Sequence, residues 1–79
     1  MNRKAKLLRN RLIPFLSVKG FNYEIKEWTN TLVLFIRQNG SMASIDLSLV
    51  RQLRINKKHL VFFMWSGAEY LFFYPKNRL

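Results

Sequence analysis

Residues 31–47, TLVLFIRQNGSMASIDL, decide the fold, because they hold two strand-like runs on either side of an Asn-Gly pair. The first run is rich in β-branched and aromatic residues, and in the second Ala43, Ile45 and Leu47 alternate with polar residues. This alternation is the period of a half-buried strand. Asn-Gly favours a type I′ turn, in which both central residues need a positive φ. The stretch therefore predicts an antiparallel hairpin that turns at Asn39-Gly40.

A further strand is predicted on the amino-terminal side of this hairpin. Phe21, Tyr23 and Ile25 alternate with polar residues, and Thr29-Asn30 supplies a turn before the central run begins. On the carboxyl-terminal side the pattern is ambiguous, because apolar residues from Met42 to Leu53 also recur at helical spacing. We therefore expect the strand to continue to about Leu47 and a short helix to follow, from Ser48 through Arg54.

A second hairpin is predicted after the polar turn at residues 56–58. Its strands cover residues 59–65 and 70–74, with Gly67 in the turn. Both strands are apolar on both faces, and a single small sheet with one helix cannot cover two apolar faces. We therefore expect a homodimer whose two chains share one core.

The amino-terminal segment, Asn2 to Ile13, predicts a helix. Ala5, Leu8 and Leu12 recur at intervals of three and four residues, and Pro14 is expected to end or kink the helix. The apolar stripe can cover the sheet while the basic face binds phosphates. The predicted fold class is α+β, with a basic helical arm over residues 1–20 and one small domain over residues 21–79.

The charge distribution points to a polyanionic partner. The 79 residues carry a formal charge of +10, and the first twenty-three contain six basic residues and no acidic one. A second basic cluster lies within residues 51–58. Such a field steers a protein toward nucleic acid, with duplex DNA favoured. The candidate nucleic-acid-binding residues are Arg3, Lys4, Lys6, Arg9, Arg11, Arg37, Asn39, Arg51, Arg54, Lys57 and Lys58.

The composition argues against catalysis and against bound metal. Without cysteine and with one histidine there is no thiolate nucleophile and little for zinc, and no phosphate-binding glycine loop is present. We expect no enzyme activity, no cofactor and no metal. The longest uncharged stretches have nine residues, about half of the roughly 20 that cross a bilayer. We therefore expect no transmembrane segment and a cytoplasmic location.

From Arg37 to Pro75 the chain resembles the AbrB and MazE type of swapped-hairpin DNA-binding transcription factors and antitoxins. The resemblance follows the segments 39–43 and 45–49, a short helix with Arg51, the polar turn at residues 56–58, Gly67 and the closing strand. It implies an interlaced homodimer with a basic surface toward DNA, in which Arg37, Asn39 and Ser41 face the groove of the DNA. Arg51 matches a basic position of that family.

The preferred function is therefore a small basic DNA-binding protein, either a transcriptional regulator or an accessory factor of a phage or other mobile element. An excisionase-like winged helix is a rival fold for the same function. A single-strand binder that stacks bases on Tyr70, Phe72, Tyr74 or Trp65 is an alternative. From another class, the chain could be a viral or plasmid inhibitor or assembly protein that binds a host protein through its aromatic face.

Overall fold

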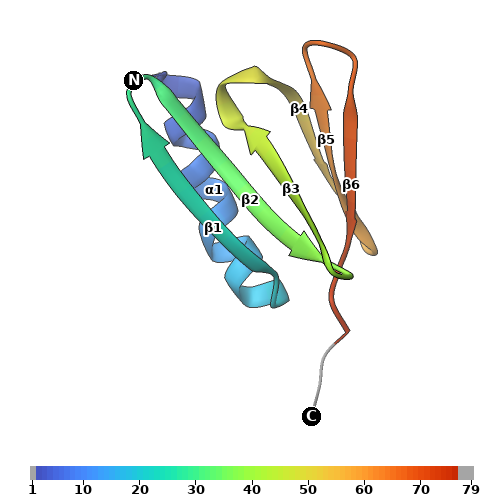
Figure 1. The fold of residues 1–79 in the computed structure, drawn as a ribbon. Coiled ribbons are helices and arrows are strands. Elements are labelled where there is room, and N and C mark those ends of the chain that lie inside the picture. The colour runs from blue at the N-terminus through green and yellow to red at the C-terminus, as the bar shows by residue number, and fades with distance from the viewer. Residues whose placement is uncertain (1, 77–79) are drawn as a thin grey trace.

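A computed structural model of the chain describes residues 2–76. The elements follow in the order α1 (Arg3–Lys19), β1 (Asn22–Trp28), β2 (Thr31–Gln38), β3 (Ser41–Asp46), a 3-10 turn η1 (Leu47–Leu49), β4 (Val50–Ile55), β5 (His59–Met64) and β6 (Glu69–Phe73) (Figure 1). The α+β class is confirmed, as is the helix that precedes the antiparallel hairpins.

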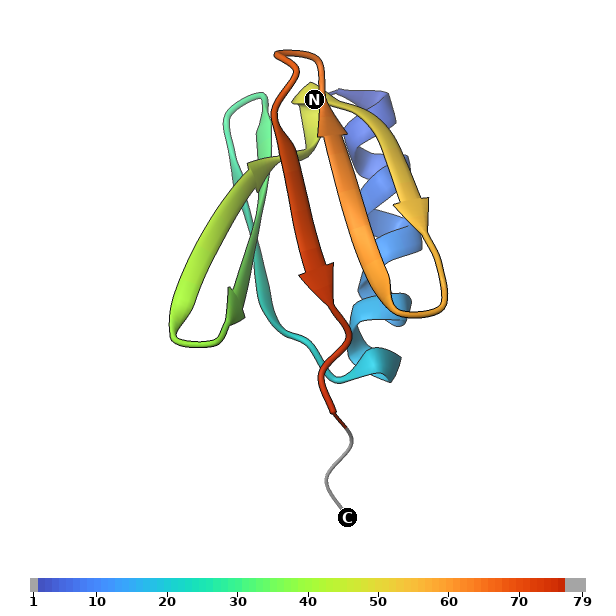
Figure 2. The same ribbon diagram turned by 90° about the vertical axis from the view of Figure 1, so that its right-hand side faces the viewer.

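The strands form two sheets. One sheet has the order β1-β2-β3 and the other the order β4-β5-β6, and all pairs are antiparallel. The η1 turn carries the chain from the first sheet to the second, and β6 is the edge of the second sheet that faces β3 (Figure 2).

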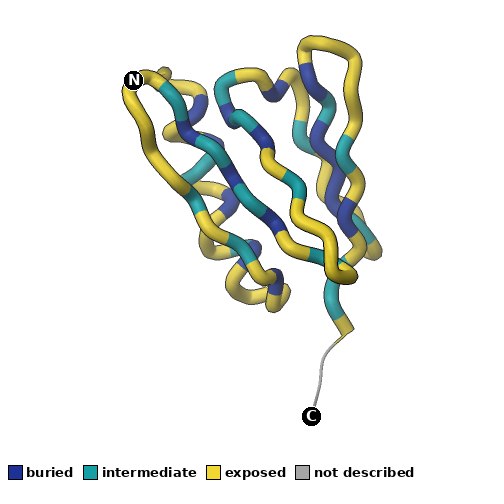
Figure 3. The backbone as a smooth tube through the Cα atoms, in the orientation of Figure 1, coloured by how far each residue is buried: buried dark blue, intermediate teal, exposed yellow. Residues whose placement is uncertain are grey.

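The turn at Asn39-Gly40 is confirmed. Asn39 has φ 53° and Gly40 has φ 79°, the positive values that a type I′ turn requires, and Gln38 pairs with Ser41 across it. This two-residue connection fixes the register of β2 and β3, which places Leu34 and Ile36 on the inner face and Phe35 and Arg37 on the outer one. Buried and less buried residues alternate along β2 as a result (Figure 3).

The short helix expected from Ser48 through Arg54 is wrong. Only Leu47–Leu49 form one 3-10 turn, capped by the Asp46 carboxylate, which accepts a hydrogen bond from the Ser48 backbone N–H at 2.9 Å. Strand β4 follows with a bulge between Val50 and Gln52. The bulge adds one residue to the strand, so Val50 and Leu53 share a face although they are three residues apart. This spacing imitates a helix in the sequence.

The expectation that Pro14 ends or kinks the helix near Ile13 is also corrected, because α1 continues through Pro14 to Lys19. A proline in a helix removes one hydrogen bond to the carbonyl four residues earlier. Here Pro14 is exposed, and Phe15 and Leu16 continue the inward-facing stripe beyond it. The helix ends at Gly20, whose φ of 79° is the left-handed cap that glycine favours.

One hydrophobic core joins the helix to both sheets. The buried stripe of α1 and the inner faces of the sheets meet in a single cluster. The helix lies behind β1 and β2 in Figure 1 and behind β4 and β5 in Figure 2. The helix and the two sheets thus depend on one another. The buried members are Ala5, Leu8, Leu12, Leu16, Phe21, Leu32, Leu34, Ile36, Ile45, Leu47, Val50, Leu60, Phe62, Met64 and Phe72.

Candidate nucleic-acid interface

A groove between α1 and β4 brings the two basic regions of the sequence together. Its volume is about 230 Å³, and Lys4 and Arg11 of the helix and Arg51 of the strand line it. The apolar part of the lining comes from Leu8 and Leu53, among others. Cations above an apolar floor can hold phosphate groups while the sugar rings contact the floor.

The helix places its two groove cations by simple periodicity. Lys4 and Arg11 are seven residues apart, so they lie on the same side of the helix two turns from each other. The core stripe through Leu8 and Leu12 fixes the rotation of α1, and this rotation turns the side with Lys4, Leu7 and Arg11 toward β4.

Arg51 reaches the groove because of the β4 bulge. The register of β4 and β5 pairs Val50 with Met64 and Gln52 with Phe63, which leaves Arg51 as the extra residue. A bulge redirects a side chain that regular alternation would point elsewhere. The basic side chain that we expected on a short helix therefore lies on a strand, yet it stands beside the cations of α1.

None of the four acidic residues, all within the described residues 2–76, lines this groove. At its amino-terminal end Lys4 Nζ lies 5.6 Å from the centroid of the Trp65 ring, within the range of a cation–π interaction. The groove is therefore uniformly positive, and its cations have no carboxylate of the same groove to neutralise them.

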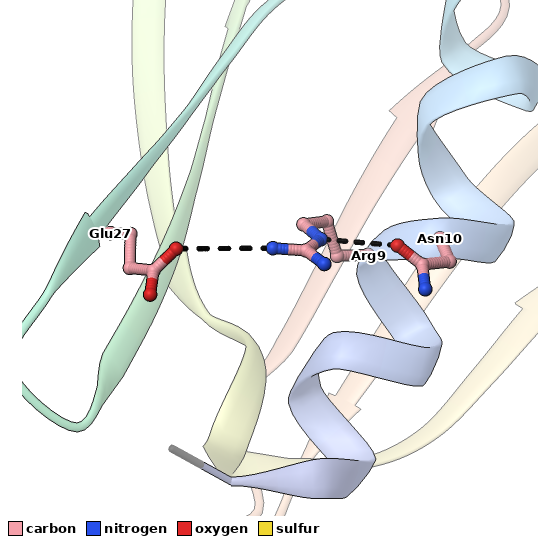
Figure 4. Close-up of polar contacts among 3 residues, drawn as sticks. All are labelled: Arg9, Asn10 and Glu27. Atoms are coloured by element: carbon pink, nitrogen blue, oxygen red, sulfur yellow. Dashed lines mark hydrogen bonds and ion pairs between the residues drawn. The ribbon is translucent and has the colours of Figure 1, made fainter.

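Arg9 is held away from the groove. Its guanidinium Nη1 lies 3.9 Å from Oε1 of Glu27 on β1, and its Nε donates a hydrogen bond of 3.2 Å to Oδ1 of Asn10 (Figure 4). The Arg9 side chain is 27% exposed and that of Glu27 is 56% exposed. Because the pair is open to solvent, it adds little stability, but it directs the Arg9 charge toward the first sheet.

The other predicted residues of the arm lie on the solvent side of α1. Arg3 and Lys6 are exposed on the helix and do not line the groove. They extend the positive surface around the helix without converging on a point. Together with Lys4 and Arg11 they make α1 the most basic element of the fold.

The remaining predicted residues are spread over other surfaces. Arg37 donates a long hydrogen bond to the Met42 sulfur on the outer face of the first sheet, and Asn39 serves the turn. Arg54 lies over the Phe63 ring at 5.3 Å on the outer face of the second sheet. The segment that holds Lys57 and Lys58 is the β4–β5 turn. The structure does not bring these residues together with the groove.

Sequence reasoning missed the groove walls Leu7, Val50 and Gln52. Leu7 carried a usable signal in the sequence, because it is a leucine next to the apolar stripe but not part of it. In the structure its side chain is 61% exposed. Val50 and Gln52 carried none, since their position depends on a bulge that has no distinctive residue type.

Most of the aromatic side chains considered for base stacking belong to the core. Phe72 is buried, and Tyr70 and Tyr74 pack against the core cluster. Burial raises the pKa of Tyr74 above its ordinary value of 10.0, and its hydroxyl donates a hydrogen bond to the Asn56 carbonyl. Trp65 alone among the four is well exposed.

We found no protein-family model, curated protein or solved structure that matches the chain. Within residues 2–76, no group of three His, Asp or Glu side chains is placed to hold a metal ion. In the same part of the chain, α1 is not apolar enough to serve as a membrane span.

Proposed function

We propose that this chain is a small nucleic-acid-binding protein that holds the phosphate backbone of duplex DNA in the groove between α1 and β4. One observation carries the proposal: Lys4 and Arg11 converge with Arg51 from the far half of the chain on a groove without a carboxylate. Cations that converge without acidic neighbours release counterions when they meet a polyanion.

Duplex DNA is favoured over single strands for two reasons. The 17 residues of α1 extend over about 25 Å, which corresponds to about seven base pairs at 3.4 Å each. Moreover, three of the four aromatic side chains considered for base stacking, Tyr70, Phe72 and Tyr74, pack in or against the core. Contacts of this kind position a protein on DNA without reading its sequence.

A cytoplasmic transcriptional regulator or an accessory factor of a mobile element would use such binding. Homodimer formation belongs to the same proposal, because Leu71 and Phe73 are exposed apolar side chains on the outer face of the second sheet. A dimer would double the number of cations that contact one DNA molecule.

The test is fluorescence anisotropy on labelled duplex and single-stranded DNA of equal length at several salt concentrations. The variant Arg11→Gln/Arg51→Gln should lower the slope of log affinity against log salt by about two, since each lost phosphate contact contributes about 0.9. The control variant Arg37→Gln/Arg54→Gln removes the same charge from the total of +10 but lies outside the groove, so its slope should change less.

Two results would count against the proposal. If the unmodified protein binds neither DNA at low salt, the groove does not hold phosphates. If the two double variants lose affinity equally, binding reflects total charge and not the groove. Light-scattering mass on the same samples tests the dimer separately, because a monomer can still bind DNA.

A further inference from the structure

The edges of β3 and β6 face each other across two hollows, and the sheets are linked at one end of this opening. Gln38, at the end of β2, donates a hydrogen bond of 2.6 Å from Nε2 to the Phe73 carbonyl, and its Oε1 accepts one of 3.3 Å from the Phe73 backbone N–H. A side-chain carboxamide thereby offers β6 the same donor and acceptor that a peptide group of a neighbouring strand would offer.

Beyond Gln38 the β3 edge has free backbone groups. The two-residue turn makes Gln38 and Ser41 a hydrogen-bonded pair, and such pairs alternate along an antiparallel ladder. Ala43 and Ile45 therefore bond to β2, while the N–H and C=O groups of Met42 and Ser44 and the N–H of Asp46 point away from it. In residues 2–76 these backbone groups form no hydrogen bond with β6. The Asp46 C=O accepts the first hydrogen bond of the η1 turn.

The β6 edge is free in the same way. Because the N–H and C=O of Phe73 bond to Gln38, they point away from β5, and Leu71 shares this direction through the two-residue period of a strand. The Tyr74 N–H bonds to the Lys58 carbonyl at 3.1 Å, which agrees with this alternation. Two sets of unpaired groups thus line the opening between the sheets.

Two hollows lie along this opening. One, of about 310 Å³, is lined by Ile36, Ala43 and Leu71, among others. The other, of about 290 Å³, lies between the end of β3 and the β5–β6 hairpin and includes Met64 and Tyr70. Alternate side chains of an extended strand are about 7 Å apart and point the same way, so they can enter successive hollows of this kind.

The β3 edge also lacks a basic residue that would oppose strand pairing. Natural edges carry charged residues, especially lysine, and the edge strands β1 and β4 have Lys26 and Arg54, respectively. The sequence of β3, SMASID, contains neither lysine nor arginine although the chain carries +10. A peptide can add a strand to an exposed sheet edge whose backbone groups are free, with apolar hollows for its alternate side chains.

We propose that the β3 edge beside β6 binds an extended peptide segment of a partner protein, which adds a strand through the free N–H and C=O groups of Met42 and Ser44 and through the N–H of Asp46. The bound segment has apolar side chains at alternate positions for the two hollows. No basic side chain lines either hollow and Asp46 lines one of them, so the side chains that enter the hollows are uncharged. This surface is separate from the α1–β4 groove, so the proposal does not depend on DNA binding.

The test is a nuclear magnetic resonance titration of ¹⁵N-labelled protein with the blocked peptide acetyl-Glu-Leu-Thr-Val-Thr-Leu-Glu-amide. Saturable shifts should be confined to amides of residues 42–46 and 69–73. Two further peptides carry N-methyl groups on one or the other set of alternate residues. Methylation of the set that faces β3 should weaken binding about tenfold, the effect of losing one or two hydrogen bonds of about 1 kcal/mol each.

A protein variant provides an independent check. Ser44→Pro removes one free N–H of the edge, a position where proline is tolerated in sheets, and should weaken peptide binding about tenfold, whereas Ser44→Ala should bind as the unmodified protein does. If no shift develops up to millimolar peptide, or if both methylated peptides bind like the parent, the proposal is overturned. If the same amides shift when the protein alone is concentrated, self-association occupies this edge, and the proposal is also overturned. The methylated peptides remain decisive if Ser44→Pro does not fold.

Discussion

The Gln38 side chain and the Phe73 backbone form a two-point link between the sheets, 35 residues apart in the chain, with hydrogen bonds of 2.6 and 3.3 Å. It is a polar substitute for strand pairing at the one end where the two edges are bridged. The link supports the closed end of the opening between β3 and β6.

Replacement of Gln38 tests the contribution of this link. Gln38→Ala should lower the free energy of unfolding by about 1 kcal/mol, because both hydrogen bonds are solvent-accessible. Gln38→Glu keeps the acceptor for the Phe73 N–H but puts a carboxylate oxygen against the Phe73 carbonyl, so it should cost at least as much as alanine. Chemical denaturation measures both, and an unchanged stability in both variants would show that the link is dispensable.

The helix is part of the core, and its inward side should dominate stability. Leu12 is fully buried, so Leu12→Ala should lower the free energy of unfolding by about 2 to 5 kcal/mol. The matched change Leu7→Ala, at a position of the same helix that lines the groove and is 61% exposed, should cost about 0.5 kcal/mol or less. Similar losses in thermal unfolding for the two variants would contradict the packing described for α1.

Pro14 interrupts the hydrogen bonds of a helix that otherwise continues to Lys19. Pro14→Ala restores an N–H toward the Asn10 carbonyl and should raise the free energy of unfolding by about 1 to 3 kcal/mol. Pro14→Gly restores the same N–H with a poorer helix former, so its gain should be smaller by about 1 kcal/mol. A loss of stability in the alanine variant would mean that proline acts mainly by restricting the unfolded chain.

The Tyr74 phenol links stability to alkaline pH. Burial raises its pKa above the ordinary value of 10.0, so the folded protein holds this proton more tightly than the unfolded chain does. The resulting stability is fully present below the unfolded pKa and is lost as the pH rises through the folded one.

Tyr74→Phe isolates this effect. Denaturation of both proteins at about pH 9 and about pH 11 should show that the variant loses less stability over this interval than the unmodified chain. Equal losses would assign the alkaline effect to other groups. The comparison is needed because lysine side chains titrate in the same range.

The hairpin at Asn39-Gly40 could be predicted because its signals are local: turn chemistry and alternation lie within a few residues of each other. Strand β4 could not be predicted for the opposite reason. Its bulge at Arg51 shifts Val50 and Leu53 to a spacing that also fits a helix, and the choice between the two is made by pairing with β5, which is a tertiary contact.

The basic residues of the groove could be predicted from the sequence, but their convergence could not. The charge pattern singled out Lys4, Arg11 and Arg51, but their convergence depends on α1 lying beside β4, which no local pattern encodes. The same pattern gave equal weight to Arg9 and Arg54. An ion pair with Glu27 keeps Arg9 out of the groove, and a contact with the Phe63 ring keeps Arg54 out of it. Net charge alone therefore does not locate a binding site.

The walls of the groove are α1 and β4, and both elements pack on the same core. The groove therefore exists only while α1 and β4 are docked. A ligand that binds there binds the native state alone, and mass action then makes the melting temperature depend on ligand concentration. At a hundredfold excess over the Kd the gain is about 2.7 kcal/mol. If a polyanion binds there, it would serve as a folding cofactor for a domain of this size, and the protein would resist proteolysis best where that ligand is abundant.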